Sequence, residues 1–440
     1  MSVRGWSFVL SWSRVGINAA LFLAATRVLS LGEIGLFATA FAPIRLTQGI
    51  HKAGISDAVT VLRRTRRMHA LFAVAVAVGG ALTVLLAALG AVFSPLLLAL
   101  STIPLINSVG AVSEGLLRQR LQLRALALRT LCAQGVGAAV ALWMLMTGWG
   151  VWALVVFALL NALLTSVLSI ALARWWPDTL PRWRGVWLIL RKTGEICGRV
   201  MLGTGLVPLV QLAIGLMLGP VAAGAFQIAT RMLELIEALS LSPLRFIALP
   251  QFSRTVSLSA DMRQHMRHTV VLAAWIWGGT LAAAPEILTL AVGTAHVTTV
   301  TPVLRAIAVF GLLNAVLMPL TQAVLAQGHT RLVLQRAAFT LMLSAVLVLP
   351  ALAVSVTTVA AAISGASLCV AFWFIPRALR ALHLSAQDLS PALLPLGAGA
   401  VMCAVLLALS PLPLIASVAL GTALYLPFLA LSHMPRRRIA

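Results

Sequence analysis

Eight basic side chains interrupt long apolar stretches of this sequence. They are Arg14, Arg27, Arg45, Lys52, Arg199, Arg231, Arg245 and Arg305. Their N–H groups can bind the oxygens of a phosphate or carboxylate, whereas burial in lipid costs about 2.5 kcal/mol or more for each charge. Arg27, Arg245, Arg199 and Arg305 lie near the ends of their stretches, where a long basic side chain can also reach the interface. The deeper ones are expected to face a water-filled cavity that takes an anionic substrate.

Three of these cations lie on two polar helical stripes. Spacings of three and seven place the first stripe on one face of a helix, and the second stripe has a comparable spacing. The stripes are Arg45, Gln48 and Lys52, and Gln227, Arg231 and Glu234. We predict that both line the substrate cavity, together with Arg14 and Arg199. The alternative for Arg231 is a structural ion pair with Glu234.

Acidic residues are scarce, with ten Asp and Glu in 440 residues. Glu234, Glu237 and Asp57 are the candidates for proton coupling, because they lie within or near the same apolar segments. For Asp57 and for Glu114, a salt bridge at a helix end is the simpler expectation.

Catalytic and metal-binding patterns are missing from the sequence. We find no paired carboxylates, no metal-spaced His and Cys, and no Gly-rich phosphate loop. The four cysteines lie in or at the edges of apolar segments and are expected to pack there. The chain is therefore predicted not to be an enzyme and to bind no metal or cofactor.

The elements that position these residues are membrane-spanning helices. With 61% hydrophobic residues, the chain lacks the polar surface of a soluble protein, so its net charge of +22 does not indicate a nucleic-acid partner. Apolar segments of about 18 to 25 residues recur along the whole chain, and each is long enough to cross the bilayer. We predict an all-α polytopic membrane protein with about 14 transmembrane helices. These include segments at 34–61, 221–249, 269–292, 301–326 and 332–349.

Lys and Arg residues concentrate in alternate connections between these segments, while the intervening connections have none. The basic connections include Arg118, Arg120, Arg124 and Arg129 in the first half of the chain, and Arg331 and Arg336 in the second. The positive-inside rule then places both termini in the cytoplasm and requires an even number of spans. One basic connection, Arg174 to Lys192, mixes four tryptophans with five cations, which is typical of an interfacial segment. We predict a multi-pass protein of the bacterial inner membrane.

The two halves of the chain share a short pattern. LSLGEIGLF from Leu29 and LMLGPVAAGAF from Leu216 each contain L-x-L-G and then G-x-F, six predicted spans apart. A six-span repeat keeps the same topology, so the substrate site is expected between two lobes, with the two polar stripes converging on one anion. We predict an N-terminal lobe at 1–173, an interfacial linker at 174–195, a C-terminal lobe at 196–376, and two further helices with a basic tail at 377–440.

The chain resembles the polysaccharide transporter family of the multidrug, oligosaccharidyl-lipid and polysaccharide exporter superfamily. The resemblance lies in four stretches: RVLSLGEIGLFATAFAPIRLTQGIHKAGIS, GWGVWALV, IGLMLGPVAAGAFQIATRM and LPQFSRT. It implies two six-helix lobes and a flippase that moves undecaprenyl-diphosphate-linked oligosaccharides to the periplasmic leaflet, for O-antigen, capsule or exopolysaccharide synthesis. The implied partners are this lipid-linked oligosaccharide, membrane lipids and the polysaccharide polymerase machinery.

Two related functions remain open at this stage. A multidrug antiporter or a flippase for the peptidoglycan precursor would show the same physical pattern. The antiporter would ordinarily need acidic cavity residues for cationic drugs, whereas these segments are cationic. The chain also departs from the family at Val210 and Gln211, where an Asp is frequent, so a coupling scheme that uses this Asp is in doubt.

Overall fold

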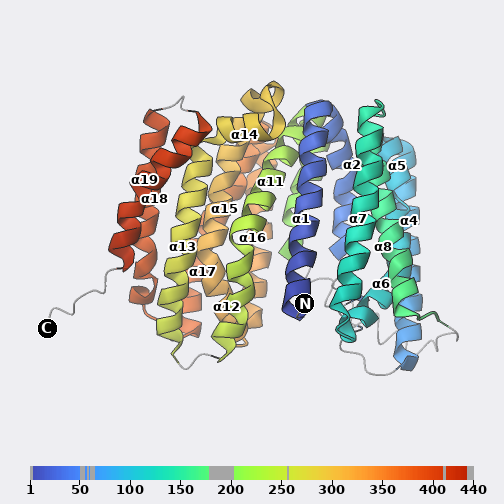
Figure 1. Cartoon of the computed structure of the whole chain (residues 1–440), viewed down its shortest axis with the longest axis horizontal. Coiled ribbons are helices and arrows are strands. Elements are labelled where there is room, and N and C mark those ends of the chain that lie inside the picture. Colours follow the sequence, from blue (N-terminus) through green and yellow to red (C-terminus); the bar gives the residue numbers. More distant parts are fainter. Residues whose placement is uncertain are drawn as a thin grey trace. The chain divides into compact units, whose positions relative to one another are not determined.

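Helices form the regular structure of this chain. The computed structural model describes residues 3–49, 55–56, 59, 65–177, 203–254, 257–409 and 413–433. Within these ranges every regular element is a helix, and none of the described residues forms a β-strand (Figure 1). This agrees with the backbone rule for lipid, in which each helix satisfies its own N–H and C=O groups. The predicted all-α class is confirmed.

The contacts divide the chain into two compact units, Met1–Gly224 and Ala225–Ala440. In the first unit, α7 packs against α1 and α8, α6 packs against α4 and α8, and α10 packs against α2. Its helices are α1 (Val3–Val28), α2 (Leu31–Gly49), α4 (Thr65–Phe93), α5 (Pro95–Leu100), α6 (Ile103–Gln119), α7 (Leu123–Met146), α8 (Trp152–Ala173) and α10 (Leu206–Met217).

The second unit takes most of α11 (Pro220–Ser240) and all helices after it. In this unit α15 packs against α12, α13 and α17, while α18 and α19 pack beside α13. The helices are α12 (Ser242–Arg254), α13 (Leu258–Ala282), α14 (Ala284–Val292), η2 (Thr294–His296), α15 (Val297–Ala326), α16 (Thr330–Ala351), α17 (Val356–Ala381), η3 (Ala386–Ala392), α18 (Leu393–Ala408) and α19 (Leu414–His433).

The same helix pattern occurs once in each unit. In the first, α6 packs between α4 and α8, and α7 packs on α8; in the second, α15 packs between α13 and α17, and α16 packs on α17. Each unit also has a serine that joins one outer helix to the middle one: Ser166 on α8 donates to the carbonyl of Ile106 on α6 at 2.8 Å, and Ser364 on α17 donates to the carbonyl of Ala306 on α15 at 2.6 Å. This repetition supports two related lobes. The lobe boundaries at 173, 195 and 376 stay a prediction.

Eight helices of the described residues are long and apolar enough to cross a membrane, and a bent pair adds a ninth candidate. Their outward-facing side chains are apolar, as for Val84, Met342 and Phe372, which are each about 70% exposed. Such residues suit contact with lipid tails. The chain is a multi-pass membrane protein, and the total of fourteen spans stays a prediction.

Two predicted spans are broken helices. The segment predicted at 269–292 begins earlier, at Leu258, and bends by 79° at Ala283, where Pro285 opens α14. The segment predicted at 221–249 is interrupted at Leu241, between α11 and α12. A proline in the first turn of a helix needs no backbone partner, so it suits the start of a new helix after a bend. Hydropathy gives no signal for such breaks.

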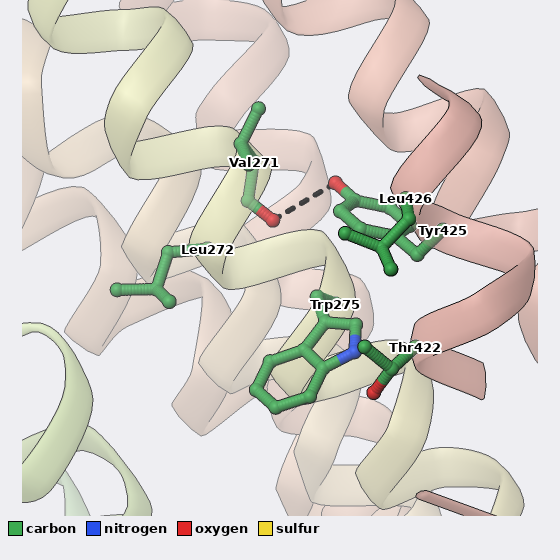
Figure 2. Close-up of a pocket in the computed structure, with 6 residues that line it drawn as sticks. All are labelled: Val271, Leu272, Trp275, Thr422, Tyr425 and Leu426. Carbon is green, nitrogen blue, oxygen red and sulfur yellow. Dashed lines mark hydrogen bonds between the residues drawn. The ribbon is translucent and has the colours of Figure 1, made fainter. Parts of the chain in front are cut away.

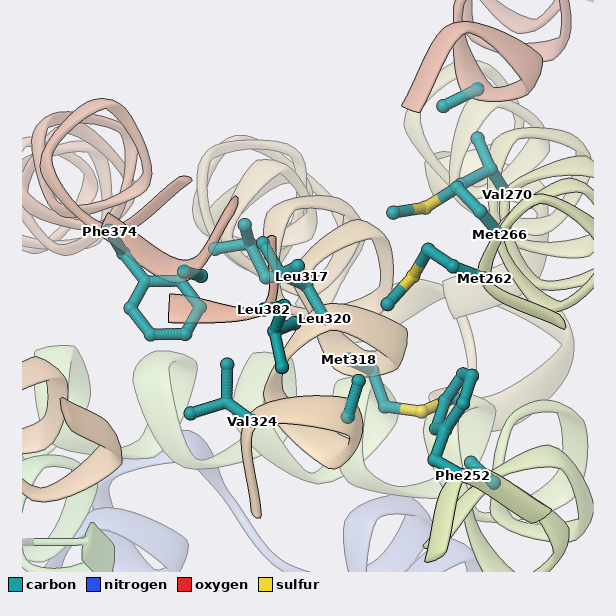
Figure 3. Packing of buried hydrophobic residues seen from close by; sticks show 14 of the residues in the cluster. Phe252, Met262, Met266, Val270, Leu317, Met318, Leu320, Val324, Phe374 and Leu382 are labelled. Carbon is teal, nitrogen blue, oxygen red and sulfur yellow. The ribbon is translucent and has the colours of Figure 1, made fainter. Parts of the chain in front are cut away.

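Methionine and aromatic side chains fill the core of the second unit. Figure 3 shows Met318 beside Phe252, Met266 beside Val270, and Phe374 and Leu317 in the same cluster. Flexible thioether side chains fill irregular gaps between crossing helices. This cluster joins α12, α13, α15 and α17.

Candidate substrate-binding residues

The first predicted stripe lies on α2. Ser30 and Glu33 begin this helix, since the Glu33 carboxylate accepts from the backbone N–H of Ser30 at 2.9 Å and the Glu33 N–H donates to the Ser30 hydroxyl at 3.3 Å. Such a capping box fixes the first turn. Arg45 and Gln48 follow three residues apart near the other end of α2, and both are half-buried. The helix therefore presents a cation and an amide on one face.

Four predicted site residues cannot be placed by their side chains. Lys52, Asp57 and Arg199 lie outside the described residues, and Arg14 lies in α1 in a part whose side chains are not described. Their roles in the cavity or in proton coupling stay predictions.

The second predicted stripe lies on α11. Gln227 is buried, whereas Arg231 and Glu234 are each about a third exposed and form an ion pair with 2.7 Å between Nη1 and Oε2. The alternative considered from the sequence, an ion pair within the helix, is therefore what the structure shows. The pair leaves Arg231 partly accessible, so its role toward a substrate stays a prediction.

Glu237, the other candidate for proton coupling on α11, is also paired with an arginine. Its Oε1 lies 3.1 Å from Nη2 of Arg245, in the first turn of the next helix, α12. The pair spans the interruption at Leu241 and joins the two helices on either side of it. Arg245 is more than half exposed.

Arg305 stabilises the bend between α13 and α14. Its Nε donates to the carbonyl of Leu281 at 3.0 Å, and its Nη2 donates to the carbonyl of Ala282 at 3.4 Å. These are carbonyls at the end of α13 that have no partner within the helix. Arg305 is thus a helix cap supplied by α15, and its position near the end of an apolar segment does not require interfacial solvation.

Arg129 belongs to a buried ionic cluster in the first unit, which was not predicted from the sequence. Nη1 of this residue lies 3.2 Å from the Glu114 carboxylate and donates to the Ser169 hydroxyl at 2.7 Å. Glu114 also binds Arg118 at 2.6 Å, in agreement with the expected salt bridge near the end of α6. Arg129 is only 7% exposed. From the sequence, Arg129 was predicted to lie in a basic connection, because it is close to the start of a helix.

Arg336 is a second cation predicted in a connection. It lies within a helix, α16. Its Nη2 donates to Oδ1 of Asn314 at 3.1 Å, and its Nη1 donates to the hydroxyl of Thr321, both on α15. The guanidinium carbon lies 5.1 Å from the centre of the Phe374 ring on α17. Among the described residues, all these partners are uncharged. The sequence signal for this role was an arginine inside the apolar segment predicted at 332–349.

An apolar pocket of about 100 Å³ lies between α13 and α19 (Figure 2). The Tyr425 hydroxyl closes one side by donating to the carbonyl of Val271 at 2.8 Å. Its lining residues are Val271, Leu272, Trp275, Thr422, Tyr425 and Leu426. With no charged group in its wall, this pocket cannot bind an anion.

No group of three or more His, Cys, Asp or Glu residues that could hold a metal occurs in the described part of the chain. The polar groups described above include guanidinium groups, amides and hydroxyls. These groups can bind oxyanions.

Comparison with known sequences adds two findings. A family described as "Polysaccharide biosynthesis protein" matches residues 24–301, which is more than half of the chain. The succinoglycan biosynthesis transport protein ExoT of Rhizobium meliloti (strain 1021) is 24% identical over 302 residues. This alignment covers 65% of the present chain and 61% of ExoT, so the chain spans less than two thirds of that relative's length.

Solved structures share the fold at low sequence identity. The lipid II flippase MurJ in an inward closed conformation is 14% identical with a TM-score of 0.77, covering 97% of this chain and 98% of MurJ. An inward-facing multidrug resistance MATE transporter of the MOP superfamily is 15% identical with a TM-score of 0.66, covering 86% of this chain and 100% of the transporter. The fold is therefore that of MurJ and MATE transporters.

Proposed function

The chain belongs to the polysaccharide biosynthesis protein family, and we propose that it flips lipid-linked oligosaccharides across the bacterial inner membrane. The substrate would be an undecaprenyl-diphosphate-linked unit, taken from the cytoplasmic leaflet and released in the periplasmic leaflet. The products would serve O-antigen, capsule or exopolysaccharide synthesis. The similarity to ExoT, a succinoglycan biosynthesis transport protein, supports this substrate class.

The observation that carries the proposal is the presence of arginines within membrane helices. Arg45 on α2, Arg231 on α11 and Arg336 on α16 all remain partly accessible. A diphosphate that leaves water needs N–H donors and positive charge, while its lipid tail can stay in the bilayer. A carrier for cationic drugs would need the opposite charge on these helices.

Proton coupling through Glu234, Glu237 or Asp57 remains part of the proposal. Glu234 and Glu237 each contact an arginine, so protonation of either would release a cation for the substrate. We propose no chemical step and no cofactor. The polymerase machinery that consumes the flipped units is the expected protein partner.

A flipping assay tests the proposed function. The purified protein is reconstituted in liposomes with a fluorescent polyprenyl-diphosphate oligosaccharide, and a membrane-impermeant quencher reports how much substrate lies in the outer leaflet. Rapid loss of the protected half of the signal is expected with this protein and not with empty liposomes. Equal signals would overturn the proposal. Faster exchange of a lipid II analogue or of a cationic dye would favour the peptidoglycan flippase or the drug antiporter.

A further inference from the structure

Arg129 and Arg336 occupy corresponding positions in the two units. Each is the seventh residue of its helix, α7 or α16. Each donates to a side chain that lies 15 residues earlier, five residues before the end of the preceding helix; this partner is Glu114 in the first unit and Thr321 in the second. The helices involved are those of the repeated pattern, α6 to α8 and α15 to α17. The molecule therefore contains two versions of one arginine site.

The two versions differ in charge. In the first unit, Glu114 neutralises Arg129, and the arginine is almost fully buried. In the second unit, a threonine stands at the glutamate's position, and the described partners of Arg336 are Thr321, Asn314 and the Phe374 ring. Since an unneutralised charge within the membrane is costly, a purely structural arginine is expected to have the carboxylate that Arg129 has.

The surroundings of Arg336 also hold the guanidinium in place without enclosing it. Asn314, Thr321 and Arg336 are all half-buried, while the Phe374 ring beneath them is fully buried. Two of the five guanidinium N–H groups are used by the α15 side chains, so others remain for a ligand.

We propose that Arg336, held by Asn314, Thr321 and Phe374, binds an anionic group of the substrate, which takes the place of the carboxylate found beside Arg129. This inference rests on the proposed function and adds a specific substrate contact to it. The shared chemistry is a group with two oxygens that can accept from a guanidinium, either the diphosphate of the lipid carrier or the carboxylate of an acidic sugar.

Binding to the purified protein tests the site independently of transport. We would measure the thermal stability of the detergent-solubilised full chain against increasing inorganic diphosphate, geranyl diphosphate and galacturonate. The two diphosphates are expected to raise the melting temperature if the lipid carrier supplies the anion, and galacturonate if the sugar does. No stabilisation by any of the three would overturn the site.

The decisive variants are Arg336→Gln and Thr321→Glu. Arg336→Gln should weaken the apparent affinity by about tenfold or more, and Arg336→Lys by less, because lysine keeps the charge and loses the planar fork. Thr321→Glu recreates the ion pair of the first unit, so it should leave the protein folded while it competes with the ligand. It keeps the test valid if Arg336→Gln fails to fold.

Arg331→Gln, five residues earlier on an exposed position of α16, is the matched control and should bind as the wild type does. Unchanged affinity in both Arg336→Gln and Thr321→Glu would overturn the proposal. If these variants lose binding while the wild-type protein moves no lipid-linked oligosaccharide in liposomes, the anion site stands and the proposed function fails. If they flip and bind normally, the function stands and the site fails.

Discussion

At the scale of single residues, the arginines within the membrane have three different roles. Arg305 caps a broken helix, Arg129 completes a buried ion pair, and Arg336 holds a charge that its described neighbours do not neutralise. Their sequence surroundings do not distinguish these roles, since each is a basic residue within or at the edge of an apolar segment. Only the neighbours brought by other helices distinguish them. An intramembrane arginine is therefore interpreted from its partners and not from its depth.

Comparing Arg231→Gln with Glu234→Gln separates a substrate contact from an ion pair. If Arg231 binds the anion, its neutralisation should reduce flipping about tenfold or more, whereas Glu234→Gln should reduce it less, because the cation remains. The flipping rate in liposomes is the measurement, with protein abundance in the membrane as the control. Equal losses in both variants would show that the 2.7 Å pair acts only as a structural unit.

Neutralising Arg45 extends the same test to α2. Arg45→Gln should impair flipping with normal membrane insertion, and Arg45→Lys should give an intermediate rate, since a point charge replaces the bidentate fork. Gln48→Ala on the same helix face is expected to have a smaller effect, because it removes no charge. Normal flipping in Arg45→Gln at normal abundance would contradict a cationic site on α2.

Arg305 should matter for stability. Arg305→Met removes two donors from the carbonyls of Leu281 and Ala282, which costs roughly 1–3 kcal/mol for groups left without partners. We expect a lower melting temperature for the purified protein and little change in diphosphate affinity. Arg305→Lys should recover part of the loss. A variant with normal stability and weakened anion binding would place Arg305 among the substrate contacts instead.

At the scale of helices, close crossings depend on small residues. Gly311 on α15 faces the ring of Trp277, and a Cβ at this position would lie 2.7 Å from ring atoms. Trp277 is fully buried, so its ring has little room to move. Glycine is common at such crossings because it lets helices approach. Gly365 on α17 is a useful contrast, since a Cβ there meets nothing within 4 Å.

Gly311→Ala should therefore destabilise the second unit, by about 1–3 kcal/mol for overpacking, while Gly365→Ala should be neutral or slightly stabilising. Thermal unfolding of the two purified variants measures the difference. A Gly311→Ala protein as stable as Gly365→Ala would show that α13 and α15 are not held as closely as the structure indicates.

At the scale of the whole molecule, hydropathy alone was enough to predict the helical class and the approximate position of most described helices. The division between α15 and α16 contains Gly328, whose φ is +83°, and it lies between the segments predicted at 301–326 and 332–349. The bend at Ala283 and the interruption at Leu241 were missed, because a broken helix is as apolar as a straight one. The ion pair between Arg129 and Glu114 could not be predicted from the sequence either, because it depends on which helices become neighbours.

The placement of Arg129 and Arg336 within helices alters the charge count that underlies the predicted topology. Both were counted in connections, and both bind groups inside a unit. The alternation nevertheless persists without them, because Arg118, Arg120 and Arg124 still flank one connection and Arg331 another. Connections at Gly148 and Gly293 still contain no Lys or Arg. The charge bias therefore continues to predict that both termini face the cytoplasm.

Reporter fusions test this topology directly. Green fluorescent protein fused after Ala440 should fluoresce, because it is fluorescent in the cytoplasm. Alkaline phosphatase at the same site should be inactive, because it is active only in the periplasm. Phosphatase inserted at Gly148 should be active, and at Gly328 inactive, since these two connections are predicted on opposite sides. The outward and inward insertions serve as controls for each other. An active phosphatase after Ala440, with the internal fusions as expected, would make the number of spans odd and would exclude fourteen.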